Sequence, residues 1–143
     1  YDMKKRIEKI KAIKNDWMES YFYVPATEVQ IEDFEEQMKI TIPLSYKDFL
    51  LLSNGAKLFG GDCFLYGVGG GIEFKISDDF SEGKVPAELL IVGFYHSSHI
   101  CYDSRYNSFI FYEYENLDEI ESECLMFSDF DEVLDYMIDI ATS

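Results

Sequence analysis

Residues 43–55 read Pro43-Leu44-Ser45-Tyr46-Lys47-Asp48-Phe49-Leu50-Leu51-Leu52-Ser53-Asn54-Gly55, and this segment predicts a short helix with both ends marked. Ser45 is a suitable N-cap residue, and Leu44 and Phe49 occupy the two positions of a hydrophobic staple. Gly55 ends the segment, because glycine adopts the left-handed conformation without steric cost. Between these ends the helix has almost no polar face, so we expect it to lie in the interior.

Three further helices are predicted around it. An amphipathic helix over residues 1–17 carries most of the positive charge, and it either packs on the domain or contacts the acidic remainder of the chain. Thr27 and Gln30 form a capping box that opens the next helix, and Ser128 is the expected cap of the last one. The two later helices have apolar stripes, Ile31, Phe34 and Met38 in one and Phe130, Val133, Leu134, Met137 and Ile138 in the other. In the helix after Thr27 the acidic residues expected to face water are Glu32, Asp33, Glu35 and Glu36.

The region between Gly55 and Ser128 predicts strands. Short apolar or alternating runs bounded by turn residues are typical of β-strands, and they occur at 63–66, 72–76, 89–95, 100–103, 109–112 and 124–127. Helices, then strands, then a helix indicate an α+β order. We therefore predict one domain over residues 1–143, with a mostly antiparallel sheet of about five to six strands covered by N-terminal helices and a C-terminal helix.

Several motifs in the first half of the chain resemble the opening of the SUKH superfamily. They are Ile31, Phe34 and Glu35, then Ile42-Pro43-Leu44, then Tyr46 and Phe49-Leu50, then Asn54-Gly55. The resemblance covers residues 26–143 and implies an antiparallel sheet covered by helices from both termini. The superfamily includes Smi/Knr-type regulators of fungal cell-wall glucan synthesis and bacterial immunity proteins that neutralise a cognate toxin. The resemblance thus implies a protein-binding domain.

The charge of the chain restricts its partners. It has 28 acidic and 12 basic residues, a net charge of −16, and from Tyr106 to its end eleven acids and no Lys or Arg. A field of this sign repels nucleic acid and anionic lipid and attracts basic proteins. No apolar run approaches the roughly 20 residues that span a bilayer. We expect a basic protein partner, no nucleic acid and no membrane.

The cysteines and histidines predict no metal site. Cys63, Cys101 and Cys124 are odd in number, far apart and in apolar surroundings, so we expect buried free thiols and a reducing, cytoplasmic location. His96 and His99 precede Cys101 closely enough to suggest zinc, but no second ligand pair accompanies them. We favour a loop with two exposed histidines.

A catalytic or cofactor site is not predicted either. The run Gly67-x-Gly69-Gly70-Gly71 is followed by a strand pattern and lacks a P-loop lysine, which favours a hairpin turn over a phosphate loop. His99 and Cys101 would share one face of a strand, and Asp103 is the one acid near them, so an enzyme is the third alternative. We predict a non-enzyme without catalytic residues, cofactor or metal.

The predicted function is therefore binding. We expect an immunity protein that occludes a toxin, with nucleases as candidates because their active sites are basic. The alternative is a regulatory scaffold of the cell-wall-synthesis type that binds an endogenous protein. Acids would steer the partner and exposed tyrosines would anchor it. The predicted partner-binding residues are Asp78, Asp79, Glu82, Tyr112, Glu113, Tyr114, Glu115, Asp118, Glu119, Glu121 and Glu123.

Overall fold

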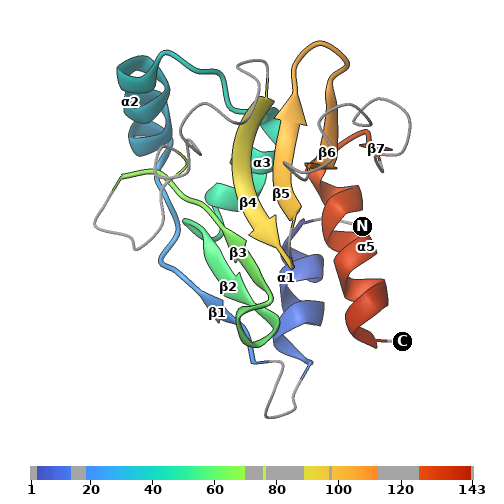
Figure 1. The fold of residues 1–143 in the computed structure, drawn as a ribbon. Helices are drawn as coiled ribbons and strands as arrows, with labels where there is room; N and C mark the ends of the chain where they lie inside the picture. Colours follow the sequence, from blue (N-terminus) through green and yellow to red (C-terminus); the bar gives the residue numbers. More distant parts are fainter. Residues whose placement is uncertain are drawn as a thin grey trace.

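The computed structural model describes residues 3–13, 19–69, 76, 89–96, 98–112 and 126–142, which form one antiparallel sheet with helices packed on it (Figure 1). The helices are α1 (Met3–Lys11), α2 (Glu28–Met38), α3 (Leu44–Leu50), a 3-10 turn η1 (Phe59–Gly61) and α5 (Phe130–Thr142). The strands are β1 (Tyr21–Phe22), β2 (Ala56–Leu58), β3 (Cys63–Leu65), β4 (Leu89–Tyr95), β5 (Ser98–Asp103), β6 (Ser108–Tyr112) and β7 (Met126–Phe127). The predicted α+β fold, with helices from both ends of the chain, is confirmed.

The sheet follows the chain in order, from β1 at one edge to β7 at the other. It has seven described strands where about five to six were expected, because β1 and β2 are too short to show an alternating pattern. β1 begins the segment 21–25, which pairs with β2 at its start and continues as an extended connector. Of the predicted strand 72–76, only Ile76 is among the described residues.

Gly93 follows a bulge in β4 and lies very close to the backbone of β3. Ile91 pairs with Cys101 and Gly93 pairs with Ile100, so Val92 is the extra residue. A Cβ atom at Gly93 would lie 2.6 Å from the carbonyl oxygen of Phe64. Glycine is required at this position by close approach of two backbones.

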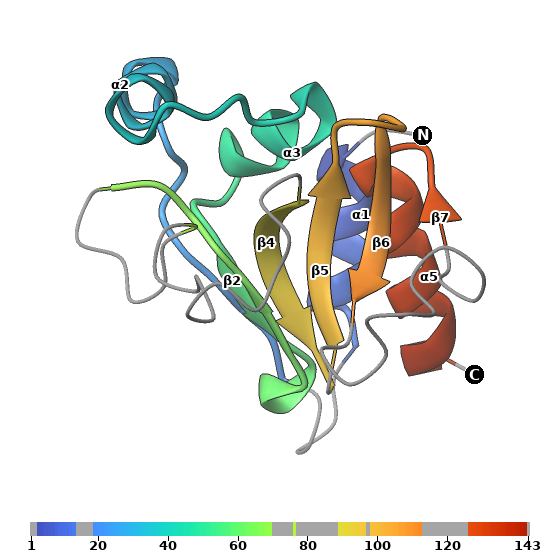
Figure 2. The same cartoon turned by 45° about the horizontal axis from the view of Figure 1, so that its top comes forward.

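One face of the sheet packs on α5, with α1 alongside that helix (Figure 2). Phe111 on β6 lies 5.6 Å from the ring of Tyr136, and Phe109 lies 5.6 Å from the ring of Phe130. Edge and tilted contacts of this kind add to the burial of apolar area that holds helix and sheet together. The other face is also apolar in its central strands, where Phe64, Phe94, His99 and Tyr112 are successive cross-strand neighbours.

The interior position predicted for α3 is confirmed, because Tyr46, Phe49 and Leu50 are all fully buried. The hydroxyl of Tyr46 reaches the carbonyl oxygens of Tyr66 and Val92, which satisfies its polar end beneath the sheet.

The predicted ends of α3 are wrong. The helix begins at Leu44, with Pro43 in the N-cap position, so Ser45 is inside the first turn. This earlier start turns Leu44 outward, where 74% of it is exposed, and no hydrophobic staple forms. The helix ends at Leu50, and Gly55 (φ +91°) belongs to the turn into β2.

The capping box of α2 is confirmed. The N–H of Gln30 donates to the hydroxyl of Thr27 (3.1 Å), and the N–H of Thr27 donates to the side chain of Gln30 (2.9 Å). At α5 the predicted cap is wrong. Asp129, not Ser128, accepts the N–H of Glu132 (3.0 Å). Asp129 immediately precedes the helix, and Ser128 is one residue too early.

Candidate functional site

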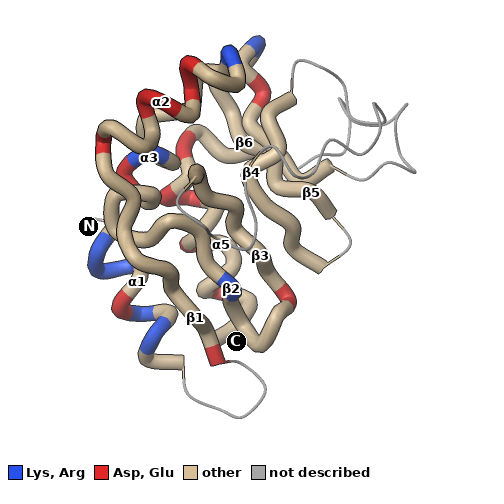
Figure 3. The backbone as a smooth tube through the Cα atoms, turned by 90° about the vertical axis from the view of Figure 1, so that its left-hand side faces the viewer, with Lys and Arg blue, Asp and Glu red and all other residues tan. Residues whose placement is uncertain are grey.

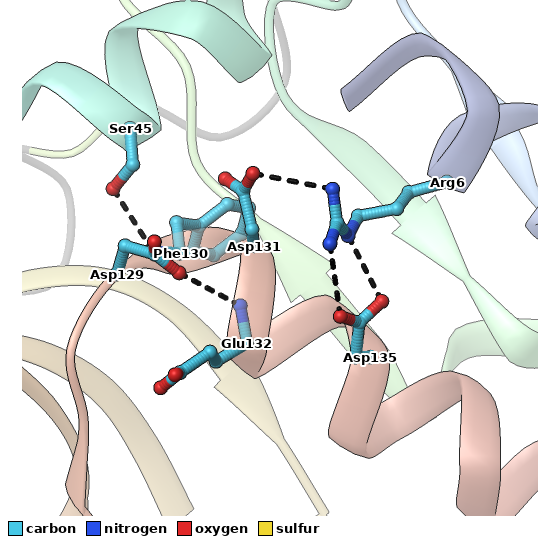
Figure 4. A network of polar contacts seen from close by, with 7 residues as sticks. All are labelled: Arg6, Ser45, Asp129, Phe130, Asp131, Glu132 and Asp135. Atoms are coloured by element: carbon cyan, nitrogen blue, oxygen red, sulfur yellow. Dashed lines mark hydrogen bonds and ion pairs between the residues drawn. The ribbon is translucent and has the colours of Figure 1, made fainter. Parts of the chain in front are cut away.

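Arg6 joins the two terminal helices (Figure 4). Its guanidinium donates to Asp135 through Nε (2.9 Å) and Nη2 (3.0 Å), and to Asp131 through Nη1 (3.2 Å). The Arg6 side chain is 9% exposed, whereas those of Asp131 and Asp135 are 30% and 45% exposed. Of the two interpretations of the N-terminal helix, packing is seen at Met3, Ile7 and Ile10, and contact with acids is seen at Arg6.

These carboxylates are not equivalent to free surface acids. Partial burial is the main reason that the pKa of Asp131 is raised, and the nearby carboxylate of Asp129 adds to the effect. The positive charge of Arg6 opposes both. Arg6, Asp131 and Asp135 therefore hold α1 against α5, so these charges stabilise the fold.

Two other cations also bond within the molecule. Arg105 donates to the carboxylate of Asp103 from Nη2 (2.9 Å) and Nε (3.0 Å). Lys47 lies 3.2 Å from Glu35, whose carboxylate also accepts the N–H of Ile42 (2.8 Å). The prediction that Glu35 faces water is wrong, because its carboxylate binds Ile42 in the segment between α2 and α3 and Lys47 on α3.

The thiols and histidines form no metal site in the described part of the chain, where no group of three or more His, Cys, Asp or Glu side chains is placed to hold a metal ion. Cys63 and Cys101 are buried and neither forms a disulfide bond, as predicted, whereas Cys124 is outside the described residues. Burial raises the pKa of the Cys63 thiol, so Cys63 is a poor nucleophile. His96 is exposed, but His99 is buried in β5, so the prediction of two exposed histidines is wrong for His99.

Tyr112 is the one predicted partner-binding residue that the structure describes, and it is fully buried. It lies opposite His99 in the ladder between β5 and β6. The prediction of an exposed anchor is therefore wrong for Tyr112, because both faces of this strand are covered. The remaining predicted residues lie outside the described ranges, namely Asp78, Asp79, Glu82, Glu113, Tyr114, Glu115, Asp118, Glu119, Glu121 and Glu123.

An acidic surface that was not assigned to binding from the sequence lies on α2. Ile31 and Phe34 face the core, and the opposite side of the helix is exposed. Val29 lies on that exposed side with Glu32, Asp33 and Glu36, at the spacing i, i+3, i+4, i+7. Figure 3 shows these acids as red bands along α2. The sequence did contain a signal for this surface, because Val29 is an apolar residue at helical spacing from the acids on the polar side of the helix.

Comparison with known proteins gives a family match. The model of the SMI1 / KNR4 family (SUKH-1) matches residues 25–136. The match begins in the connector before α2 and ends within α5, so it includes α2, α3 and strands β2 to β7 and leaves out α1 and β1. A similar protein is the uncharacterized protein YnaB of Bacillus subtilis (strain 168), which is 28% identical over 124 residues, 84% of this chain and 81% of YnaB. Among the described helices, none combines the length and apolar character needed to cross a membrane.

Proposed function

Because the chain belongs to the SMI1 / KNR4 family (SUKH-1), we propose that it is a non-catalytic protein-binding domain, and specifically an immunity protein that neutralises a cognate basic toxin. In this role the protein performs no covalent chemistry. It covers the working surface of the toxin, and its stability and charge determine how fast and how tightly it does so.

The observation that carries the proposal is the excess of acidic residues at the surface. The net charge is −16, and Arg6, Lys47 and Arg105 each bond to a carboxylate of the same chain. The exposed acids on α2 and α5 are not the partners of these three cations, so their negative potential extends into the solvent. Such a field repels nucleic acids and accelerates encounter with a basic protein.

A nuclease is the toxin class that fits this charge best. A nuclease binds phosphates through Lys and Arg side chains, so its active site attracts any surface that presents carboxylates in their place. An acidic protein that docks there competes with the substrate for the same cations. The expected signature is an association rate that falls steeply as the salt concentration rises.

Co-expression tests the proposal. The product of each reading frame that flanks this gene is induced in a bacterial host with and without the chain. A product that stops growth is the candidate toxin, and its catalytically inactive variant serves as the control. Rescue of growth by the chain, together with a complex of the two purified proteins, is the expected result. A toxin that kills equally in both strains would refute the immunity role. Binding to an endogenous protein without any rescue would indicate a regulatory scaffold.

A further inference from the structure

We propose that the basic partner docks on one particular surface, which we call the α2 face, made by Val24, Val29, Glu32, Asp33, Glu36 and Leu52. The inference rests on the proposed function, since it names the face through which that function is carried out. The partner surface that fits it has Lys or Arg side chains around an apolar projection.

The first argument is the concentration of exposed apolar side chains. The described residues include eight large exposed hydrophobic side chains, and five of them fall between positions 21 and 52. Val24 is 83% exposed, Val29 is 63% exposed and Leu52 is 38% exposed. Single exposed apolar residues are ordinary, but a group of them bordered by charge is typical of a binding surface.

The backbone brings two of these residues together. The N–H of Asn54 donates to the carbonyl of Val24 (3.1 Å), and the N–H of Ala26 donates to the carbonyl of Leu50 (2.9 Å). The connector before α2 therefore runs along the end of α3, and Val24 lies near Leu52. Val29 follows in the first turn of α2.

The second argument is the charge beside these apolar residues. α2 has the sequence EVQIEDFEEQM and contains no Lys or Arg, so no cation within the helix neutralises its exposed acids. Glu32 and Glu36 are four residues apart, and like charges at that spacing repel each other. Glu35 has a cationic partner, Lys47, but it is turned toward α3. A basic partner would relieve the repulsion between Glu32 and Glu36.

The third argument is that the face is held in place before binding. The capping box fixes the start of α2, and Lys39 in the left-handed conformation ends it. The bonds of Glu35 to Ile42 and Lys47 hold its last turns against α3. A rigid surface loses little conformational entropy on binding. α2 also stands at one end of the molecule, away from α1 and α5 (Figures 1 and 2).

Charge complementarity identifies the occupant. A second copy of this chain would bring together two molecules that each have a net charge of −16, and nucleic acid would be repelled in the same way. Lys and Arg satisfy the three carboxylates, while an apolar side chain between them covers Val29. A basic protein surface meets both requirements.

The test uses as the probe the catalytically inactive variant of the toxin that the co-expression experiment identifies. Association and dissociation rates with the full chain are measured at low and physiological salt. The variant Glu32→Lys/Glu36→Lys reverses the charge of two of the three acids of the face, and Val29→Ser removes its apolar centre. The matched control is Glu8→Lys/Asp139→Lys, which changes the net charge equally at exposed positions on α1 and α5. Thermal unfolding verifies that all variants fold.

We expect the α2 double reversal to slow association about tenfold more than the control reversal does, because steering acts at the docking face. Val29→Ser should raise the dissociation rate about fivefold and leave association nearly unchanged. Chemical labelling of carboxylates in the complex gives an independent readout. Glu32, Asp33 and Glu36 should be protected, and Glu8 and Asp139 should remain reactive.

Each other outcome overturns a defined statement. If the unmodified chain does not bind the toxin domain, the proposed function and the α2 face fail together. If it binds and the α2 variants behave like the control, only the α2 face fails. If reversal of Glu115, Asp118 and Glu119 slows association instead, docking occurs at the acids predicted from the sequence, and the inference is wrong.

Discussion

The hydroxyl of Ser45 on α3 accepts the backbone N–H of Phe130, the first residue of α5, at 2.9 Å across 85 positions of sequence. Beside this bond the ring of Phe130 lies 4.7 Å from Tyr46 and 5.5 Å from Phe49. The first N–H groups of a helix have no partner within it, so a side chain from α3 completes the start of α5. One serine thus links the interior helix to the helix that covers the sheet.

Ser45→Ala should lower the free energy of unfolding by about 1 kcal/mol, because it removes this bond and leaves the N–H of Phe130 poorly solvated. Urea unfolding measures the change. Ser128→Ala is the control, since its hydroxyl is exposed and its backbone N–H still donates to Glu132 (2.8 Å). Equal losses in the two variants would contradict the assignment of Ser45 as a cap across helices.

Arg6→Met should destabilise the protein by about 2 kcal/mol, because it removes the cation that Asp131 and Asp135 share. The loss should be less than for a fully buried pair, since both carboxylates are partly open to water. Without Arg6 the pKa of Asp131 should rise further, because the cation is the neighbour that lowers it. NMR titration of the Asp131 carboxyl measures that shift.

The control for Arg6 is Lys4→Met, an exposed cation on the same helix. It should change stability by less than about 0.5 kcal/mol. Equal effects of the two substitutions would show that α1 is held by its apolar stripe alone.

The parts of the fold that could be predicted are the elements whose apolar residues recur at regular spacing in the sequence. The stripe of α5 from Phe130 to Ile138 is buried as predicted, and β4, β5 and β6 fall where runs of apolar and aromatic residues occur. These patterns depend on local periodicity, which the sequence displays directly. The capping box at Thr27 is equally local and was equally predictable.

The parts that could not be predicted depend on contacts between distant segments. No residue near Ser45 in the sequence indicates that its hydroxyl accepts the backbone N–H of Phe130. Tyr112 was predicted to be an exposed anchor for a partner, yet it is fully buried, because segments distant in the sequence pack around it. The acids of α2 were visible, but the exposure of Val24 and Val29 beside them follows from the packing of α2.

Gly93→Ala should destabilise the protein by about 2–3 kcal/mol, because the new Cβ would meet the carbonyl oxygen of Phe64 at 2.6 Å. Relief requires β3 and β4 to separate at the bulge. Gly69→Ala is the comparison, since among the described residues no atom beyond its chain neighbours lies within 4 Å of its Cβ position, and its positive φ (+46°) is what resists the change. It should cost about 1 kcal/mol. Thermal unfolding of both variants would show whether steric contact is the larger effect.

Asp103→Asn should weaken the fold at neutral pH by an amount that shrinks in acid. The Asp103 side chain is 5% exposed, and its pKa is lowered mainly by hydrogen bonds from the Arg105 side chain. The charged form is therefore favoured in the folded state, so its contribution is present above pH 3.8, the ordinary value, and is lost as the pH falls through the folded pKa. We expect about 1–2 kcal/mol at pH 7.

Asp131→Asn is the matched control for this pH dependence, because the pKa of Asp131 is shifted in the opposite direction. A raised pKa means that the folded state binds the proton of Asp131 more tightly than the unfolded state does. The free energy of unfolding therefore falls as the pH rises above 3.8, the ordinary pKa of this carboxyl. Relative to the unmodified protein, Asp131→Asn should gain stability with rising pH while Asp103→Asn loses it. Urea unfolding at several pH values between about 3 and 7 gives both slopes. Slopes of the same sign would show that the bonds of Arg105 do not control the titration of Asp103.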